Sequence, residues 1–198
     1  MDSGRSLVIG CGALARELVA LTRQLPAVEV ACLPASLHNR PGGIPAAVRS
    51  RIAEAREAGA DRIFVAYADC GTGGLLDRVL AEEGVERLPG AHCYDVFTGS
   101  ETFQGLQDEQ LGTFYLTDFL VRNFDRLVIQ GLGLDRHPEL REAYFGNYTR
   151  VIYLAQMHDT GLLEAARVAA NRLGLAFETR YTGLAGLARP VLAFAGVA

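Results

Sequence analysis

Residues 62–80 read RIFVAYADCGTGGLLDRVL, and this stretch decides the fold. Its first part, residues 62–67, is a short apolar run that is typical of a buried strand. Its last part, residues 75–80, has the apolar spacing of an amphipathic helix, and a polar, glycine-rich turn joins the two. The Asp69 carboxylate and the Cys70 thiol are therefore expected at the carboxyl end of a strand, which is where parallel α/β sheets bind ligands.

The same alternation of apolar runs and helical patterns recurs along the chain. It predicts an α/β fold with a doubly wound, mostly parallel sheet and helices on both faces. Strands are expected at residues 6–10, 28–33, 62–67, 85–88, 125–130, 150–155, 175–181 and 191–194. Helices are expected at residues 13–24, 44–58, 75–83, 114–123 and 162–173, with Pro26 closing the first helix and a strand at 113–117 as the alternative to the fourth.

A chain of 198 residues fits a single α/β domain over residues 1–198. A weak internal repeat offers a second possibility, because TGGLLD at residues 72–77 resembles TGLLE at residues 160–164. Each follows an expected strand and opens an expected helix, so two similar Rossmann-like lobes, 1–98 and 99–198, are conceivable. The alternative is that any α/β protein reuses such turns.

The composition excludes several classes of protein. Hydrophobic residues make up 49% and charged residues 21%, which is typical of a folded chain, and the net charge of −4 gives no reason to expect a nucleic-acid partner. All 19 cationic residues are arginine, so neither Schiff-base chemistry nor a phosphate-loop lysine is available. No apolar run is long enough to span a membrane and no signal peptide is evident, so we expect a cytoplasmic protein with 4 reduced cysteines.

Thiols and imidazoles gather after the expected strands. The positions concerned are Cys11, Cys70 and His158, which follow strands directly, His92 and Cys93, which follow residues 85–88, and His38, which lies on the loop after residues 28–33. Thiolates and neutral imidazoles are the ligands that Zn²⁺ prefers, and ligands from separate strand ends leave a metal in an open cleft. We expect a zinc site with Cys11, Cys70 and Cys93 as thiolates and His92 or His158 as the next ligand.

Two carboxylates, Asp69 and Asp159, adjoin this set. Either could act as a base or fix a histidine tautomer, so Asp69 and His158 are the expected catalytic groups. A metal-free alternative makes Cys70 or Cys93 a nucleophile activated by His92 or His158. A third possibility is that the cysteines are small residues of tight turns or of the core, and Cys32, which lies inside a strand, is expected to be a core residue.

Glycine-rich turns raise a further, ligand-binding interpretation. Gly10 and Gly12 form half of the dinucleotide fingerprint, although its third glycine is absent. Gly71 and Gly73, before a helix, could hold a phosphate on backbone amides. His38 and Arg40 lie on a polar loop from which arginine could clamp an anion. The alternative is that these glycines serve tight turns and that Arg40 is solvated, as is also expected of Asp118, Arg122 and Asp125.

Six motifs together resemble a known family. They are Cys11-Gly12 with Glu17 following, LHNRP at residues 37–41, YADCG at residues 67–71, AHC at residues 91–93, Gly99-Ser100, and GTFY at residues 112–115. In order and spacing they resemble the bacterial and archaeal family known as domain of unknown function 1638, over residues 7–160. In that pattern an acidic residue separates the histidine from the cysteine, whereas here His92 and Cys93 are adjacent and Asp95 lies beyond them.

The resemblance implies no settled activity. Members of the family often occur beside corrinoid-dependent methyltransferase systems, which implies a one-carbon context with a corrinoid protein as a possible partner. The leading expectation is a zinc-dependent enzyme, of methyltransferase type or hydrolytic, that acts on the thiol or methyl groups of a small-molecule substrate. The alternatives are a non-catalytic module that binds a corrinoid or another anionic ligand, and the metal-free cysteine nucleophile. A homodimer is also expected.

Overall fold

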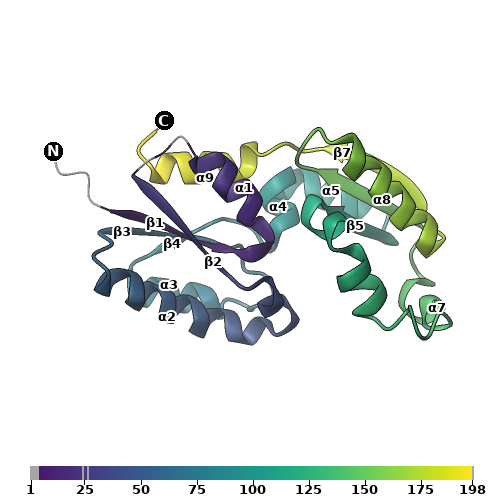
Figure 1. The fold of residues 1–198 in the computed structure, drawn as a ribbon, viewed down its shortest axis with the longest axis horizontal. Coiled ribbons are helices and arrows are strands. Elements are labelled where there is room, and N and C mark those ends of the chain that lie inside the picture. The colour runs from purple at the N-terminus through teal and green to yellow at the C-terminus, as the bar shows by residue number, and fades with distance from the viewer. Residues whose placement is uncertain (1–4, 24, 26, 198) are drawn as a thin grey trace. The chain divides into compact units, whose positions relative to one another are not determined.

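A computed structural model describes residues 5–23, 25 and 27–197 of the chain (Figure 1). The expected helix end at Gln24 and its terminator Pro26 lie outside these residues. The chain has the α/β, doubly wound fold expected from the sequence, with parallel strands and helices in alternation. It packs as two compact units: residues up to Gly99 together with those from Ala185 onward, and residues Ser100–Leu184.

The first unit is built on a four-stranded parallel sheet with the order β2-β1-β3-β4. Its strands are β1 (Ser6–Cys11), β2 (Val28–Leu33), β3 (Arg62–Ala66) and β4 (Glu86–Arg87). β1 lies between β2 and β3 and is buried along its whole length. A continuous apolar run is the expected sequence of a strand that is covered on both faces, which explains why SLVIGC takes the central position.

Helices cover both faces of this sheet (Figure 1). They are α1 (Ala15–Thr22), α2 (Ile44–Glu57), α3 (Leu75–Glu83), α4 (Cys93–Thr98) and α9 (Ala185–Phe194), with 3₁₀ turns η1 (Gly12–Leu14), η2 (Ala35–Asn39) and η3 (Pro41–Gly43). α2 and α3 pack together below the sheet in Figure 1, and α1 and α9 lie above it.

The strand expected at residues 191–194 is wrong, because these residues belong to α9. Leu187 and Val191 lie one helical turn apart and are both fully buried, so the apolar run faces the core as a helix. Gly186 allows α9 to approach α4, since a Cβ at this position would lie 1.9 Å from the Val96 carbonyl oxygen. A short apolar run cannot by itself distinguish a strand from a helix with one buried face.

The second unit has a three-stranded parallel sheet in the order β5-β6-β7. Its strands are β5 (Thr113–Thr117), β6 (Arg150–Ala155) and β7 (Ala176–Tyr181). Its helices are α5 (Ser100–Glu109), α6 (Asp118–Arg122), α7 (Leu140–Phe145) and α8 (Thr160–Leu173), with a π-helical turn, η4 (Asp125–Gln130).

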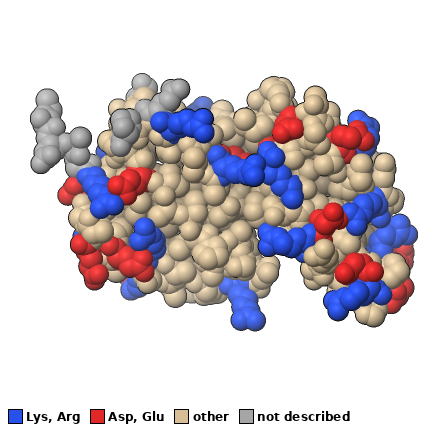
Figure 2. Space-filling view, viewed as in Figure 1, with Lys and Arg blue, Asp and Glu red and all other residues tan. Residues whose placement is uncertain are grey.

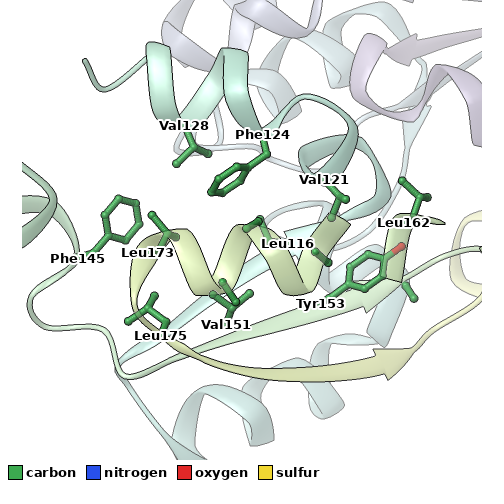
Figure 3. Close-up of a cluster of buried hydrophobic side chains, with 14 of the residues drawn as sticks. Leu116, Val121, Phe124, Val128, Phe145, Val151, Tyr153, Leu162, Leu173 and Leu175 are labelled. Carbon is green, nitrogen blue, oxygen red and sulfur yellow. The ribbon is translucent and has the colours of Figure 1, made fainter. Parts of the chain in front are cut away.

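Two expectations in this unit are corrected. Residues 113–117 form a strand, as in the alternative, so the helix expected at 114–123 is wrong over its first half. Residues 125–130 are helical rather than extended. Phe124 and Val128, four residues apart, both enter the core cluster between α8 and the turn (Figure 3), so the helical conformation buries apolar side chains on one face.

Asp118 was expected in solvent, and the structure buries it completely. Its Oδ1 accepts hydrogen bonds from the Tyr153 hydroxyl at 2.7 Å and from the Gln156 amide at 3.0 Å. The carboxylate follows β5 directly and so joins the carboxyl ends of β5 and β6. Its second oxygen, Oδ2, is buried without a partner among the described residues.

Charges on the face shown in Figure 2 are interspersed, with blue arginine groups beside red carboxylates. This pattern agrees with the many exposed ion pairs, such as Arg5 with Glu29 and Arg180 with Glu178. Exposed pairs of this kind contribute little to stability, on the order of 0–1 kcal/mol each. Among residues 5–23, 25 and 27–197, no helix combines the length and the apolar character that crossing a bilayer requires.

Candidate thiol site

The strand order of the first unit places a topological switch point at the carboxyl ends of β1 and β3. The chain continues from β1 to β2 on one side, and β3 lies on the other side of β1, so the strand order reverses between β1 and β3. Such a switch point is where open α/β sheets bind ligands. Cys11 is the last residue of β1, and Cys70 lies in the turn after β3. The sequence therefore brings two thiols to this switch point.

Cys11 is buried and partnered by a histidine. Its Sγ accepts a hydrogen bond from the Ala13 amide at 3.3 Å and so caps η1, and it lies 3.7 Å from His38 Nδ1. Burial raises the pKa of the Cys11 thiol from 9.0 to about 11. Burial also lowers the pKa of His38, so the pair at neutral pH is a thiol and a neutral imidazole.

Cys70 is the single non-glycine residue with a positive φ among the described residues, at +53°. A side chain in this left-handed region costs about 1–2 kcal/mol. The turn is held by its backbone, because the Cys70 amide donates to the Ala91 carbonyl oxygen at 2.7 Å and the Asp69 amide donates to the Gly90 carbonyl oxygen at 3.1 Å. Backbone strain held in place by surrounding structure is a recognised mark of functional positions.

Cys93 interacts electrostatically with Cys70 and Cys11. It opens α4 and is part-buried, as is Cys70. Burial, followed by the charge of Cys11, raises the pKa of Cys70 to about 12. Burial, followed by the charges of Cys70 and Cys11, raises the pKa of Cys93 to about 12. The three thiols are thus near enough for ionisation of one to oppose ionisation of the others.

Tyr67 is a member of this site that sequence reasoning missed. It is fully buried, and its hydroxyl interacts with the Cys11 thiol, whose pKa it lowers. Its ring stacks on that of His38 with centroids 6.2 Å apart. Burial and then the charge of Cys11 raise the pKa of Tyr67 above its ordinary range. The available signal was a hydroxyl at the last position of an otherwise apolar run, at the carboxyl end of the predicted strand.

Asp69 closes its own turn. Its Oδ1 accepts hydrogen bonds from the Thr72 hydroxyl at 2.5 Å and the Gly74 amide at 2.9 Å, and its Oδ2 accepts one from the Gly73 amide at 3.1 Å. The hydroxyl of Thr72, followed by the two amides, lowers the pKa of Asp69. The carboxylate therefore occupies the amides that a phosphate would use, and the turn supplies its own anion.

The remaining predicted binding residues frame the switch point. Gly12 allows a close approach to the end of β2, since a Cβ there would lie 2.8 Å from the Leu33 carbonyl oxygen. Gly71, at φ +82°, faces Pro41, whose Cγ would lie 3.5 Å from such a Cβ. Arg40, which precedes Pro41, is exposed. The loop that carries His38 and Arg40 is thus packed against the turn that carries Cys70.

His92 and His158 occupy different places. His92 is the N-cap of α4, and its Nδ1 lies 3.6 Å from Asp95 Oδ2. His158 belongs to the second unit, where its ring stacks on Tyr181 with centroids 3.7 Å apart. Asp159, beside it, caps α8 through a hydrogen bond from the Leu162 amide. The structure brings the imidazole of His38 to Cys11.

Cys32 was expected to be a core residue, and this expectation is wrong. It lies on β2, at the edge of the sheet, and is exposed. Its neighbour across the sheet is Gly10. An edge strand lacks a neighbour on one side, and β2 contains no fully buried residue. Cys32 is therefore the exposed thiol of this unit, although its charge also raises the pKa of Cys11 and of Tyr67.

In this conformation no group of three His, Cys, Asp or Glu side chains within the described part of the chain has an arrangement that could enclose a metal ion. The chemical character of the donors nevertheless discriminates between roles. A metal-free nucleophile needs a lowered thiol pKa, and here burial raises all three. Raised thiol pKa values are also typical of buried cysteines that serve packing.

A family model described as protein of unknown function (DUF1638) matches residues 32–190. This range includes His38, Cys70 and Cys93 and stops short of Cys11. No curated protein and no solved structure matches the chain.

Proposed function

Because the chain belongs to the DUF1638 family of proteins of unknown function, which supplies no activity, we propose a function from the site itself: the first unit binds Zn²⁺ through Cys11, Cys70 and Cys93. The proposal is supported by the position of Cys11 and Cys70 at the switch point, with His38 Nδ1 3.7 Å from Cys11 Sγ, and by the electrostatic interaction of Cys93 with both thiols. His38 replaces His92 as the fourth donor in this proposal, because His92 Nδ1 is directed to the N-terminus of α4.

The cost of ionising buried thiols is consistent with a role in binding a metal ion. Each thiol resists ionisation because it is buried and because its neighbours would share the negative charge. A divalent cation reverses both effects, since it offsets the repulsion between thiolates and binds the deprotonated form. Binding would therefore draw the three sulfur atoms together and release their protons. The strained turn at Cys70 would then have a purpose, because functional positions are where such strain is retained.

Zinc in such a site would hold the thiol of a small-molecule substrate as a thiolate at neutral pH, or polarise a bound water. His38 would act as an exchangeable donor beside the metal, and the Tyr67 hydroxyl would be available to donate a hydrogen bond to the bound group. The family resemblance suggests methyl transfer from a corrinoid protein to the bound thiolate. A zinc-dependent hydrolase is the other reaction class that this donor set supports.

The other two interpretations receive less support. A binding module for an anion would need free amides in the glycine-rich turn, and Asp69 already occupies those of Gly73 and Gly74. A metal-free cysteine nucleophile would need a cationic partner, and burial favours the neutral form of His38.

The test is a zinc titration of purified protein, with Co²⁺ as a spectroscopic substitute for Zn²⁺. We expect about one equivalent of metal and a thiolate-to-cobalt charge-transfer band. Cys11→Ser, Cys70→Ser and Cys93→Ser should each weaken binding at least tenfold, whereas Cys32→Ser should not. Absence of tight binding, or equal loss in Cys32→Ser, would contradict the proposal.

A further inference from the structure

The second unit contains a pocket of its own at the carboxyl ends of β6 and β7. The cavity measures about 270 Å³, and its wall includes Tyr153, His158, Asp159, Leu163 and Tyr181. All five residues belong to the second unit and lie apart in sequence from the thiol site. Cavities for drug-sized ligands begin at about 300 Å³, so this pocket suits a smaller molecule.

Aromatic rings form much of the wall. The rings of His158 and Tyr181 stack with an interplanar angle of 18°, and Tyr181 is 57% exposed. Tyr153 is buried beneath α8, and Figure 3 shows its hydroxyl oxygen on the side of Leu162. Aromatic faces attract cations through their quadrupole, so this wall favours a cationic ligand over an anionic one.

A buried carboxylate behind Tyr153 adds to this preference. The Tyr153 hydroxyl donates to Asp118 Oδ1, which makes its own ring richer in electrons. Asp118 is 0% exposed, and its Oδ2 has no partner among the described residues. A buried charge is costly unless a charge of opposite sign lies nearby. Arg122 lies 4.0 Å from Oδ2 of Asp159, a carboxylate of the pocket wall.

The net charge around the pocket is negative. Asp118 and Asp159 contribute two negative charges, and Arg122 contributes one positive charge. All three charges affect the pKa of Tyr153. The N-terminus of α8 does not reverse this balance, because Asp159 already caps it by accepting a hydrogen bond from the Leu162 amide at 3.0 Å. An anion would therefore meet carboxylates and a helix end that is already capped.

We infer that the second unit binds a small organic ammonium ion in this pocket, beside the exposed ring of Tyr181 and the wall carboxylate of Asp159, with the buried carboxylate of Asp118 adding negative charge behind Tyr153. The site is independent of the thiols of the first unit. The experiment below can therefore support or contradict this inference whatever the outcome of the zinc titration.

The experiment compares two probes of nearly equal shape, choline and its uncharged carbon analogue 3,3-dimethyl-1-butanol, by titration calorimetry of the full chain. Choline should bind, and the alcohol should bind at least tenfold more weakly. Tyr181→Ala should weaken choline binding at least fivefold, and Asp118→Asn should do the same if it folds. Tyr144→Ala is the matched control, because Tyr144 is an exposed tyrosine on α7 outside the pocket and should leave binding unchanged.

Any of three results would overturn the inference: no binding of choline, equal binding of the two probes, or equal loss in Tyr144→Ala. Tyr181 is more than half exposed, so its substitution keeps the test valid even where Asp118→Asn does not fold. Cys70→Ser should bind choline like the unmodified protein, which separates this pocket from the metal site.

Discussion

The left-handed backbone of Cys70 makes a prediction that separates backbone strain from thiol chemistry. The perturbation is a pair of substitutions, Cys70→Ala and Cys70→Gly. Both remove the thiol, so its contacts cancel in the comparison, and the difference between them reports the conformation at φ +53°. Alanine keeps a Cβ that this region disfavours, whereas glycine adopts it freely.

The magnitude follows from two opposing effects. Relief of the left-handed conformation favours glycine by about 1–2 kcal/mol, and the greater freedom of glycine in the unfolded chain opposes this by about 0.5–1 kcal/mol. We therefore expect Cys70→Gly to be more stable than Cys70→Ala by about 1 kcal/mol. The same pair at Cys93, which has a helical conformation in α4, should show the reverse order, because helices favour alanine over glycine.

The assay is urea unfolding with a chelator present, so that metal binding does not contribute. The chain has 7 tyrosines and no tryptophan, so tyrosine fluorescence and circular dichroism are the suitable probes. A result in which Cys70→Ala equals or exceeds Cys70→Gly in stability would refute the inference that strain is held at this turn. The same order of stability at both cysteines would show that the effect comes from residue type alone.

Three further predictions concern the same unit. Gly12→Ala should destabilise the protein by about 1–3 kcal/mol and weaken zinc binding, because the added Cβ would meet the Leu33 carbonyl oxygen. A Cβ at Gly42 would meet nothing within 4 Å, so Gly42→Ala should have neither effect. Urea unfolding and zinc titration of both variants test this comparison. Zinc binding at pH 7 should release about three protons, measured by calorimetry in buffers of different ionisation enthalpy, and release of one or none would exclude a three-thiol ligand set. Above pH 9 the free energy of unfolding of the metal-free protein should fall by up to about 1.4 kcal/mol per pH unit for Cys11, since the thiol of the unfolded chain ionises near 9.0 while the folded one keeps its proton to about 11. Cys70 and Cys93, whose pKa values are about 12, should contribute to the same fall, so Cys11→Ser should reduce the slope without abolishing it in unfolding curves at pH 8, 9 and 10. An unchanged slope in Cys11→Ser would contradict the raised pKa of Cys11.

The sequence by itself determined the α/β class and the carboxyl-edge positions of the thiols. Strands such as residues 6–11 and 150–155 are continuous apolar runs, and such runs followed by glycine and an amphipathic helix have few other solutions. This pattern of apolar residues depends only on neighbouring positions in the sequence. The strand and helix of residues 62–80 could therefore be predicted from these residues alone.

Only the tertiary structure decided which side chains meet. Residues 125–130 and 191–194 are apolar runs too short for their period to be read, and packing made both helical. His38 rather than His92 reaches Cys11, because the position of a loop depends on contacts such as that of Pro41 with Gly71, which lie far apart in sequence. The burial of Asp118 and of the Tyr67 hydroxyl has the same origin. Polarity predicts the solvent exposure of an isolated residue, whereas burial depends on what the rest of the fold places around it.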